Sequence, residues 1–152
     1  MNKRLVVLAM VLGLVLGFVR ISAAGDTATV NVSATVQGNC KFLSGGSVSF
    51  TLDPNSSSDA TGTVVQPTFW CTKGSTYTIT DDYGANESGT TFRMKDSGTN
   101  YIPYSFTYTN TGTGGGRGTT KTMDISSTVL NANFINATAG SYTDTVILTI
   151  NP

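Results

Sequence analysis

Apolar and polar residues alternate with a period of two along several short segments of this chain, and that period is typical of half-buried β-strands. The clearest run is 27–36, followed later by 102–108. The apolar members of these runs are Val30, Val32, Ala34 and Val36, and then Ile102, Tyr104, Phe106 and Tyr108. Clusters of Gly, Asn, Asp and Ser separate the runs, and no segment after residue 24 shows the period of an amphipathic helix. We therefore predict an all-β fold of the sandwich type.

Further short runs predict the remaining strands. They lie at 48–52, 63–71, 76–80, 91–95, 120–126 and 142–150. Pro67 and Pro103 interrupt two runs, and proline cannot donate to a strand ladder, so each indicates a sheet edge or a bulge. The glycine-rich segment 110–118 predicts a mobile loop.

The beginning of the chain has the pattern of a secretory signal peptide. Two basic residues, Lys3 and Arg4, precede an apolar run at 5–19, and Ala23-Ala24 offers a cleavage site. We expect cleavage after Ala24, which assigns 1–24 to the signal peptide. An uncleaved membrane anchor is the alternative, although the run is shorter than the roughly 20 residues that span a bilayer.

Two cysteines, Cys40 and Cys71, lie in the part of the chain expected to be exported. An oxidising compartment favours a disulfide between them. Two free thiols or a metal pair remain the alternatives, but no histidine occurs in the sequence and no carboxylate stands near either cysteine. We expect no metal site.

The composition argues against catalysis and against polyanionic partners. Charged residues make up 12% of the chain, with nine basic and nine acidic side chains, so nothing indicates binding to nucleic acid. The absence of histidine removes the commonest general base. We expect neither an enzyme nor a small-molecule cofactor. Trp70 is interpreted as core packing beside the disulfide, and Asp81-Asp82 as a solvated turn.

The arrangement of the first and last predicted strands suggests a function. An immunoglobulin-like sandwich needs about seven strands, and removing 27–36 leaves about six. Such a body would expose an apolar groove and unpaired backbone groups, which recruit a strand from another chain. The alternative is that 27–36 pairs within its own chain as an ordinary first strand.

Four segments resemble a known family. The residues 71–79 are similar to a C-x-x-G-x-x-Y-x-I motif, and 139–146 to a closing A-G-x-Y-x-D-x-V motif. The segments 84–94 and 30–40 resemble the loop and opening strand of the same family. The family is the spore coat protein U domain, which includes subunits of archaic chaperone–usher pili.

The resemblance implies an incomplete immunoglobulin-like sandwich completed by a donor strand. It divides the chain into the signal peptide, a donor strand with its spacer at 25–39, and a pilin domain at 40–152. The donor residues are then Val30, Val32, Ala34 and Val36. The last strand would border the groove with Tyr142, Val146, Leu148 and Ile150.

The function implied is that of a structural pilin, secreted through the periplasm to surface fibres that support adhesion and biofilm formation. Its implied partners are further copies of itself in a head-to-tail polymer, a periplasmic chaperone and an outer-membrane usher. A monomeric secreted or coat-associated binding module with a complete sandwich is the alternative.

Overall fold

The computed structural model describes residues 24–152, so the predicted signal peptide lies, apart from Ala24, outside the described residues. The chain divides into two units that meet between Thr35 and Val36, and each is described by itself. Within the first unit, residues 24–35 form neither helix nor strand and their side chains are exposed. The strand predicted at 27–36 is therefore absent from the single chain.

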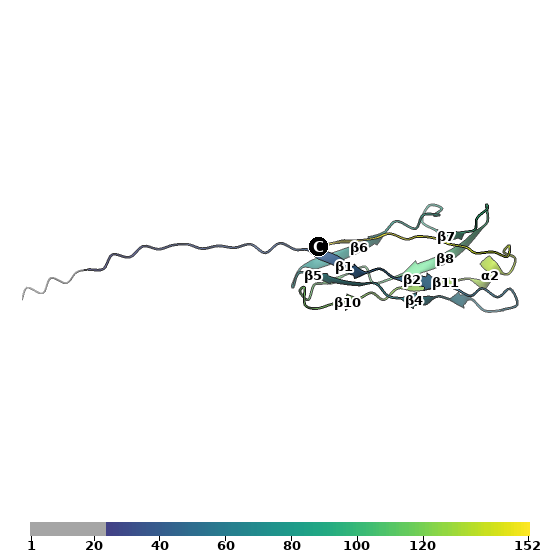
Figure 1. The fold of residues 1–152 in the computed structure, drawn as a ribbon, viewed down its shortest axis with the longest axis horizontal. Helices are drawn as coiled ribbons and strands as arrows, with labels where there is room; N and C mark the ends of the chain where they lie inside the picture. The colour runs from purple at the N-terminus through teal and green to yellow at the C-terminus, as the bar shows by residue number, and fades with distance from the viewer. Residues whose placement is uncertain (1–23) are drawn as a thin grey trace, which may run out of the picture. The chain divides into compact units, whose positions relative to one another are not determined.

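The second unit, called the body below, runs from Val36 to Pro152, and its regular secondary structure is almost entirely β-strand (Figure 1). The elements are β1 (Cys40–Ser44), β2 (Ser47–Ser49), β3 (Ala60–Thr61), β4 (Thr63–Val65), β5 (Thr68–Cys71), β6 (Thr76–Asp81), β7 (Phe92–Lys95), β8 (Tyr101–Thr107), β9 (Thr111–Thr113), β10 (Lys121–Thr122), β11 (Ser126–Val129), α2 (Asn131–Phe134) and β12 (Leu148–Asn151). The predicted all-β class is confirmed.

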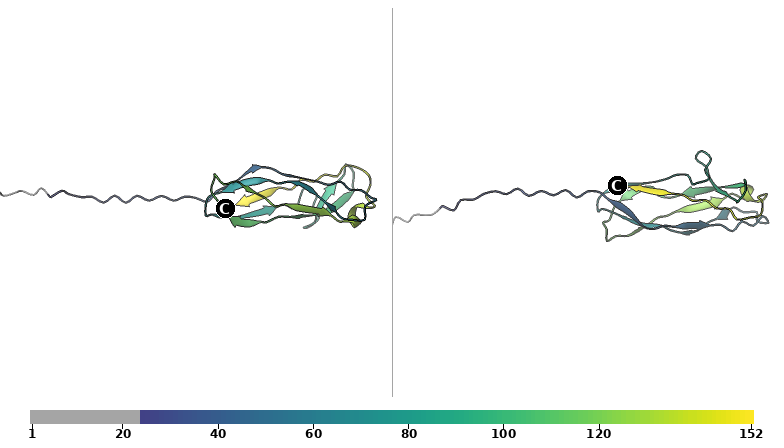
Figure 2. Two further views of the ribbon diagram at one scale, coloured as in Figure 1. Left: turned by 90° about the horizontal axis from the view of Figure 1, so that it is seen from below. Right: turned by 45° about the horizontal axis from the view of Figure 1, so that its top comes forward.

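The strands form small antiparallel sheets. Their orders are β1-β5-β10, β12-β6-β9, β3-β11-β8-β7 and the pair β2-β4. The first two sheets pack face to face, because the buried Phe69 of β5 meets the buried Tyr77 of β6 with ring centroids 5.1 Å apart. Figure 2 shows β12, in yellow, running along the body to the C-terminus.

The core consists of two apolar clusters. The first fills the space between β5 and β6, and its buried members are Phe69, Cys71, Tyr77, Ile79, Met123 and Ile125. The second lies where β8, β11 and α2 meet, and its buried members are Ile102, Val129 and Phe134. The alternation of the sequence places these side chains inward, and burial of each contributes about 1.5–3 kcal/mol.

The disulfide between Cys40 and Cys71 is confirmed. The two cysteines face each other across the β1–β5 ladder. Next to the bridge, the Thr72 amide donates to the Asn39 carbonyl at 2.8 Å, and the Asn39 amide donates to the Thr72 hydroxyl at 3.0 Å. The chain therefore enters the body at residues 37–39, held against Thr72.

The two prolines behave differently. Pro67 falls in the break between β4 and β5, so the single strand predicted at 63–71 is two separate strands in the structure. Pro103 instead lies inside β8, opposite Arg93 of β7, and that strand is not at a sheet edge. Its carbonyl accepts from the Asn133 side chain at 3.2 Å.

The prediction of a mobile loop at 110–118 is wrong. Residues 111–113 form β9 against β6, Gly114 donates to the Ser75 carbonyl at 2.7 Å, and Gly116 donates to the Cys71 carbonyl at 2.9 Å. A Cβ on Gly112 would lie 2.5 Å from the Tyr77 hydroxyl oxygen. Glycine is used here for close backbone approach to a ring and not for flexibility.

Two further predictions need correction. The last strand is β12 at Leu148–Asn151, shorter than the predicted 142–150, although Thr143 forms an isolated bridge with Lys95. Trp70 does not pack in the core, because its neighbours Phe69 and Cys71 point inward and Trp70 therefore faces outward, half-buried. Among residues 24–152, no helix has the length and apolarity needed to cross a membrane.

Candidate functional site

An apolar groove of about 640 Å³ runs along the body between two chain segments. One wall is the 42–50 segment, which contains β2, and the other is the 142–148 segment, which leads into β12. The groove begins beside the first core cluster, at Phe42 and Leu148. It ends beside the second cluster, at Phe50 and Tyr142.

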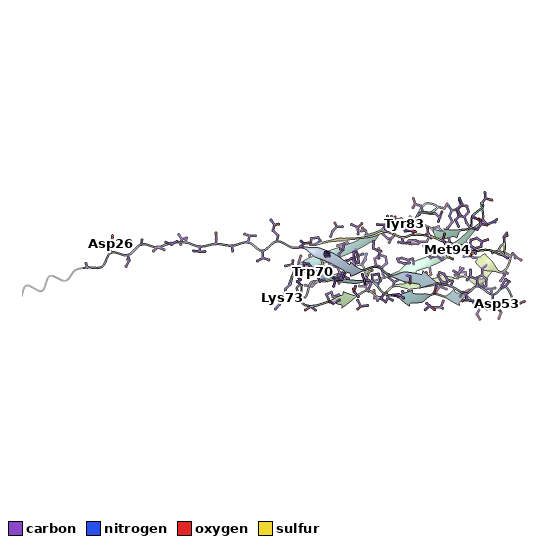
Figure 3. All side chains as sticks on the ribbon, in the orientation of Figure 1. Asp26, Asp53, Trp70, Lys73, Tyr83 and Met94 are labelled. Carbon is purple, nitrogen blue, oxygen red and sulfur yellow. A yellow bond between two sulfur atoms is a disulfide. The ribbon has the colours of Figure 1, made fainter. Side chains whose placement is uncertain are left out.

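The floor of the groove consists of apolar and aromatic side chains, of which three are partly exposed and two, Pro67 and Ile125, are buried. They come from β7, β8 and the chain before β5 and β11, and they are Met94, Tyr104, Phe106, Pro67 and Ile125. Figure 3 shows Met94 between the two ends of the body, nearer to the end labelled Asp53 than to the end labelled Lys73. The floor therefore joins the two clusters in one continuous apolar surface.

The strands beside the groove lie at sheet edges within the described chain. β1 pairs only with β5, β2 only with β4, and β12 only with β6. An edge strand presents backbone N–H and C=O groups that a further strand can pair with. The groove thus combines apolar side chains with free hydrogen-bonding edges, which is the chemistry that recognises an extended, alternating peptide.

A polar network holds the 142–148 wall in place. The Asp144 carboxylate accepts from the Asn86 amide at 3.1 Å, from the Asn86 side chain at 3.0 Å and from the Tyr104 hydroxyl at 2.7 Å. Gly84 adopts φ +85° directly against this carboxylate, where any Cβ would collide with Asp144. Arg93 fixes the loop by donating to the Asn86 carbonyl at 2.9 Å.

The network keeps Tyr104 protonated. Burial, followed by the hydrogen bond to Asp144, raises the pKa of the Tyr104 phenol well above its ordinary value. Tyr108 is placed similarly: burial and its 2.7 Å hydrogen bond to Asp81 raise its pKa. The Tyr104 phenol therefore donates to the groove wall at Asp144, and the Tyr108 phenol donates to the end of β6 at Asp81.

Asp82 supports the same wall from outside. Its carboxylate accepts from the Ile147 amide at 2.9 Å and from the Gly84 amide at 3.0 Å. The hydrogen bond from Ile147 is the main cause that lowers the pKa of Asp82. The Asp81-Asp82 pair, predicted to be a solvated turn, therefore anchors Tyr108 and Ile147 instead.

The structure brings together three of the four residues predicted for the last strand. Tyr142, Val146 and Leu148 line the groove. Ile150 lies further along β12 and packs against the first core cluster.

Of the predicted donor residues, Val30, Val32 and Val36 are 82%, 90% and 83% exposed. Exposure this high is unusual for alternating valines and leaves their apolar surface available.

Sequence reasoning missed the floor and the network. The signal for Asp144 was present, because it stands in the closing A-G-x-Y-x-D-x-V segment, but only the structure shows that it binds Asn86 and Tyr104. Gly46 was also missed: a Cβ there would lie 2.5 Å from the Val65 carbonyl oxygen.

Among residues 24–152, no group of three or more His, Cys, Asp or Glu side chains is placed to hold a metal ion.

The fold and the groove define an all-β sandwich domain with an apolar groove between edge strands. The model of the Spore Coat Protein U domain matches residues 26–149. The chain belongs to this family of structural, non-enzymatic proteins, and the resemblance seen in the sequence is confirmed.

Comparison with solved structures gives a similar chain in the CsuC–CsuE chaperone–tip adhesion subunit pre-assembly complex from the archaic chaperone–usher Csu pili of Acinetobacter baumannii. The identity is 17% and the TM-score 0.48, over 76% of this chain and 40% of the matched chain. The present chain thus corresponds to well under half of that chain's length. No curated protein sequence matches this chain.

Proposed function

We propose that this protein is a structural pilin of an archaic chaperone–usher pilus that polymerises by donor-strand complementation. The observation that supports the proposal is the pairing of an open groove, flanked by edge strands, with an alternating apolar segment that is exposed in the single chain. Residues 27–36 of one copy would fill the groove of another. The domains are then a signal peptide at 1–24, a donor strand with its spacer at 25–39 and a pilin domain at 40–152.

The dimensions of the two surfaces agree. The donor residues Val30 to Val36 cover seven positions, as does the 142–148 wall, and seven extended residues span about 23 Å. One face of that strand carries three valines and an alanine, which fit an apolar floor. Burying the three valines would contribute about 5–8 kcal/mol.

A donor strand also satisfies the backbone groups at the edges of the groove. Each new ladder hydrogen bond contributes about 0.5–1.5 kcal/mol. Because the donor segment lies outside the body that accepts it, the contact is head-to-tail and generates an open fibre. Before assembly, the groove of a free subunit needs cover, and a periplasmic chaperone would supply it until an outer-membrane usher passes the subunit into a fibre.

The fibre would lie on the cell surface, where the family resemblance implies adhesion and biofilm formation. The competing proposal, a monomeric binding module with a complete sandwich, requires the groove to be closed by the chain itself. If the protein is a pilin, an added copy of 27–36 should raise the melting temperature. If it is a binding module with a complete sandwich, the added copy should leave the melting temperature unchanged.

The test compares three forms of the chain starting at Gly25, all produced without a chaperone. The first is the native form, the second carries a copy of 27–36 after Pro152 through a short linker, and the third carries the same copy with Val32→Asp. We expect the second form to be a monomer that melts at least about 15 °C above the others, which should aggregate or form ladders. Equal melting of all three as monomers would favour the binding module.

A further inference from the structure

The basic and acidic residues of the body fall largely in different segments of the sequence. The segments 36–52, 60–80 and 107–123 contain four basic residues and no acidic residue. These four are Lys41, Lys73, Arg117 and Lys121. All eight acidic residues of the body lie elsewhere, accompanied only by Arg93 and Lys95.

The basic residues gather around Trp70 at one end of the body. Lys41 is the ladder partner of Trp70, and the Arg117 guanidinium lies 5.9 Å from the centroid of the Trp70 ring. Lys73 lies beside the residue that precedes Arg117, because a Cβ built on Gly116 would be 3.5 Å from the Cβ of Lys73. We call Lys41, Trp70, Lys73, Arg117 and Lys121 the basic end.

The opposite end carries an acidic loop between β2 and β3. Asp53 and Asp59 are exposed there, and no lysine or arginine occurs from residue 42 to residue 72. Figure 3 places Lys73 and Asp53 at opposite ends of the body. Asp53 stands three residues after Phe50, so the acidic loop adjoins one end of the groove. The other end of the groove, at Phe42, adjoins Lys41 of the basic end.

The N-terminal segment leaves the body at the basic end. Residues 37–39 are bound to Thr72, next to Lys73, and the Thr72 hydroxyl also approaches the Gln37 carbonyl at 3.4 Å. Only residue 36 and those before it are free to enter another groove. One residue spans at most about 3.6 Å. A donor strand that fills a neighbour's groove therefore brings its own basic end against one end of that groove.

We propose that the basic end of each subunit docks on the Asp53–Asp59 loop of the copy that accepts its donor strand. This rests on the proposed function. Meeting the acidic loop pairs opposite charges, whereas meeting the Lys41 end of the groove would place like charges together. Charge complementarity thus selects the end of the groove at which the donor strand emerges. Residue 36 of the donating copy then lies near Phe50 of the accepting copy, and residue 30 lies near Phe42.

The contact can be tested on fibres of the full chain with a carbodiimide, which joins an amine directly to a carboxylate. Fibres assembled from a mixture of isotope-labelled and unlabelled subunits report which bonds link two different copies. We expect mixed-isotope peptides that join Lys41, Lys73 or Lys121 to Asp53 or Asp59. Their yield should fall about threefold between 10 mM and 1 M NaCl, because the Debye length shrinks from about 30 Å to about 3 Å and exposed pairs are weak.

Charge exchange supplies the specific control. Lys73→Glu should lower the yield, and adding Asp53→Lys should restore a bond between the exchanged positions. Lys95→Glu, which changes the charge equally at a site away from the basic end, should leave the yield unchanged. Crosslinks from the basic end to other carboxylates, or a yield that ignores salt, would overturn the proposal while fibres still form. A wild-type chain that forms no fibres would instead refute the proposed function on which the inference rests.

Discussion

Replacement of Asp144 by alanine would release the 142–148 wall of the groove. The carboxylate accepts three hydrogen bonds, two from Asn86 and one from the Tyr104 hydroxyl. Hydrogen bonds to a charged group contribute about 1.5–3 kcal/mol each when buried. Asp144 is half-buried and the three bonds act as a unit, so the sum is discounted, and we expect a loss of about 2–4 kcal/mol.

The free energy of unfolding should be measured by urea denaturation on the form that carries its own added donor strand, because that form is expected to be monomeric. Asp144→Asn keeps the shape of the side chain and one acceptor oxygen for Asn86. The loss in the free energy of unfolding should therefore stay at about 1 kcal/mol. Tyr104→Phe should cost about the same. A cycle with both substitutions should show coupling of about 0.5–1 kcal/mol. If Asp144→Ala costs less than about 0.5 kcal/mol, or if Asp144→Asn is equally damaging, the network does not hold the wall.

Three other substitutions test separate parts of the account. Val32→Asp in the full chain should abolish fibres, counted by electron microscopy, because a charge would enter an apolar groove; normal fibres from this variant would count against strand donation. Replacing Cys40 and Cys71 by alanine should lower stability by about 3–4 kcal/mol, since the bridge closes a loop with a sequence separation of 31; a loss below about 1 kcal/mol would contradict this. The pKa of Asp82 is lowered in the folded state, mainly by the Ile147 amide, so its stabilising effect is present above about pH 4 and disappears as the pH falls through the folded value. Asp82→Asn should therefore flatten the fall in melting temperature between pH 4 and pH 2, and an unchanged slope would exclude this role.

The strands of the body were predictable because their signals are local. Alternation at Tyr77 and Ile79, and at Ile102, sets which side chains face the core, and the structure buries all three. Cys40 and Cys71 were predicted to pair from the compartment alone. Their positions directly opposite each other in the β1–β5 ladder came from the fold.

The errors arose where tertiary contacts decide the outcome. The glycines near Gly112 look like a flexible linker, but they allow the backbone to lie against the Tyr77 ring as an edge strand. Trp70 was assigned to the core because it stands beside Cys71, while the period of β5 turns it outward beside Arg117. The role of Asp144 could not be predicted either, because Asn86 lies 58 positions away and the contact depends on folding.

The predicted first strand illustrates a different limit. Residues 27–36 have the pattern of a strand, yet they form none in the single chain. A strand needs a partner to complete its backbone hydrogen bonds, and a sequence pattern does not say whether that partner belongs to the same molecule. The groove between the 42–50 and 142–148 segments offers a partner of the right chemistry.

The most direct test of donor-strand complementation is a cryo-electron microscopy map of fibres formed by the full chain. Donor-strand complementation predicts density for an added strand between the 42–50 and 142–148 walls, which continues through residues 37–39 into the body of the adjacent subunit. Val30, Val32, Ala34 and Val36 should face the floor of the groove. An empty groove, or one filled by residues 27–36 of the same molecule, would contradict the account.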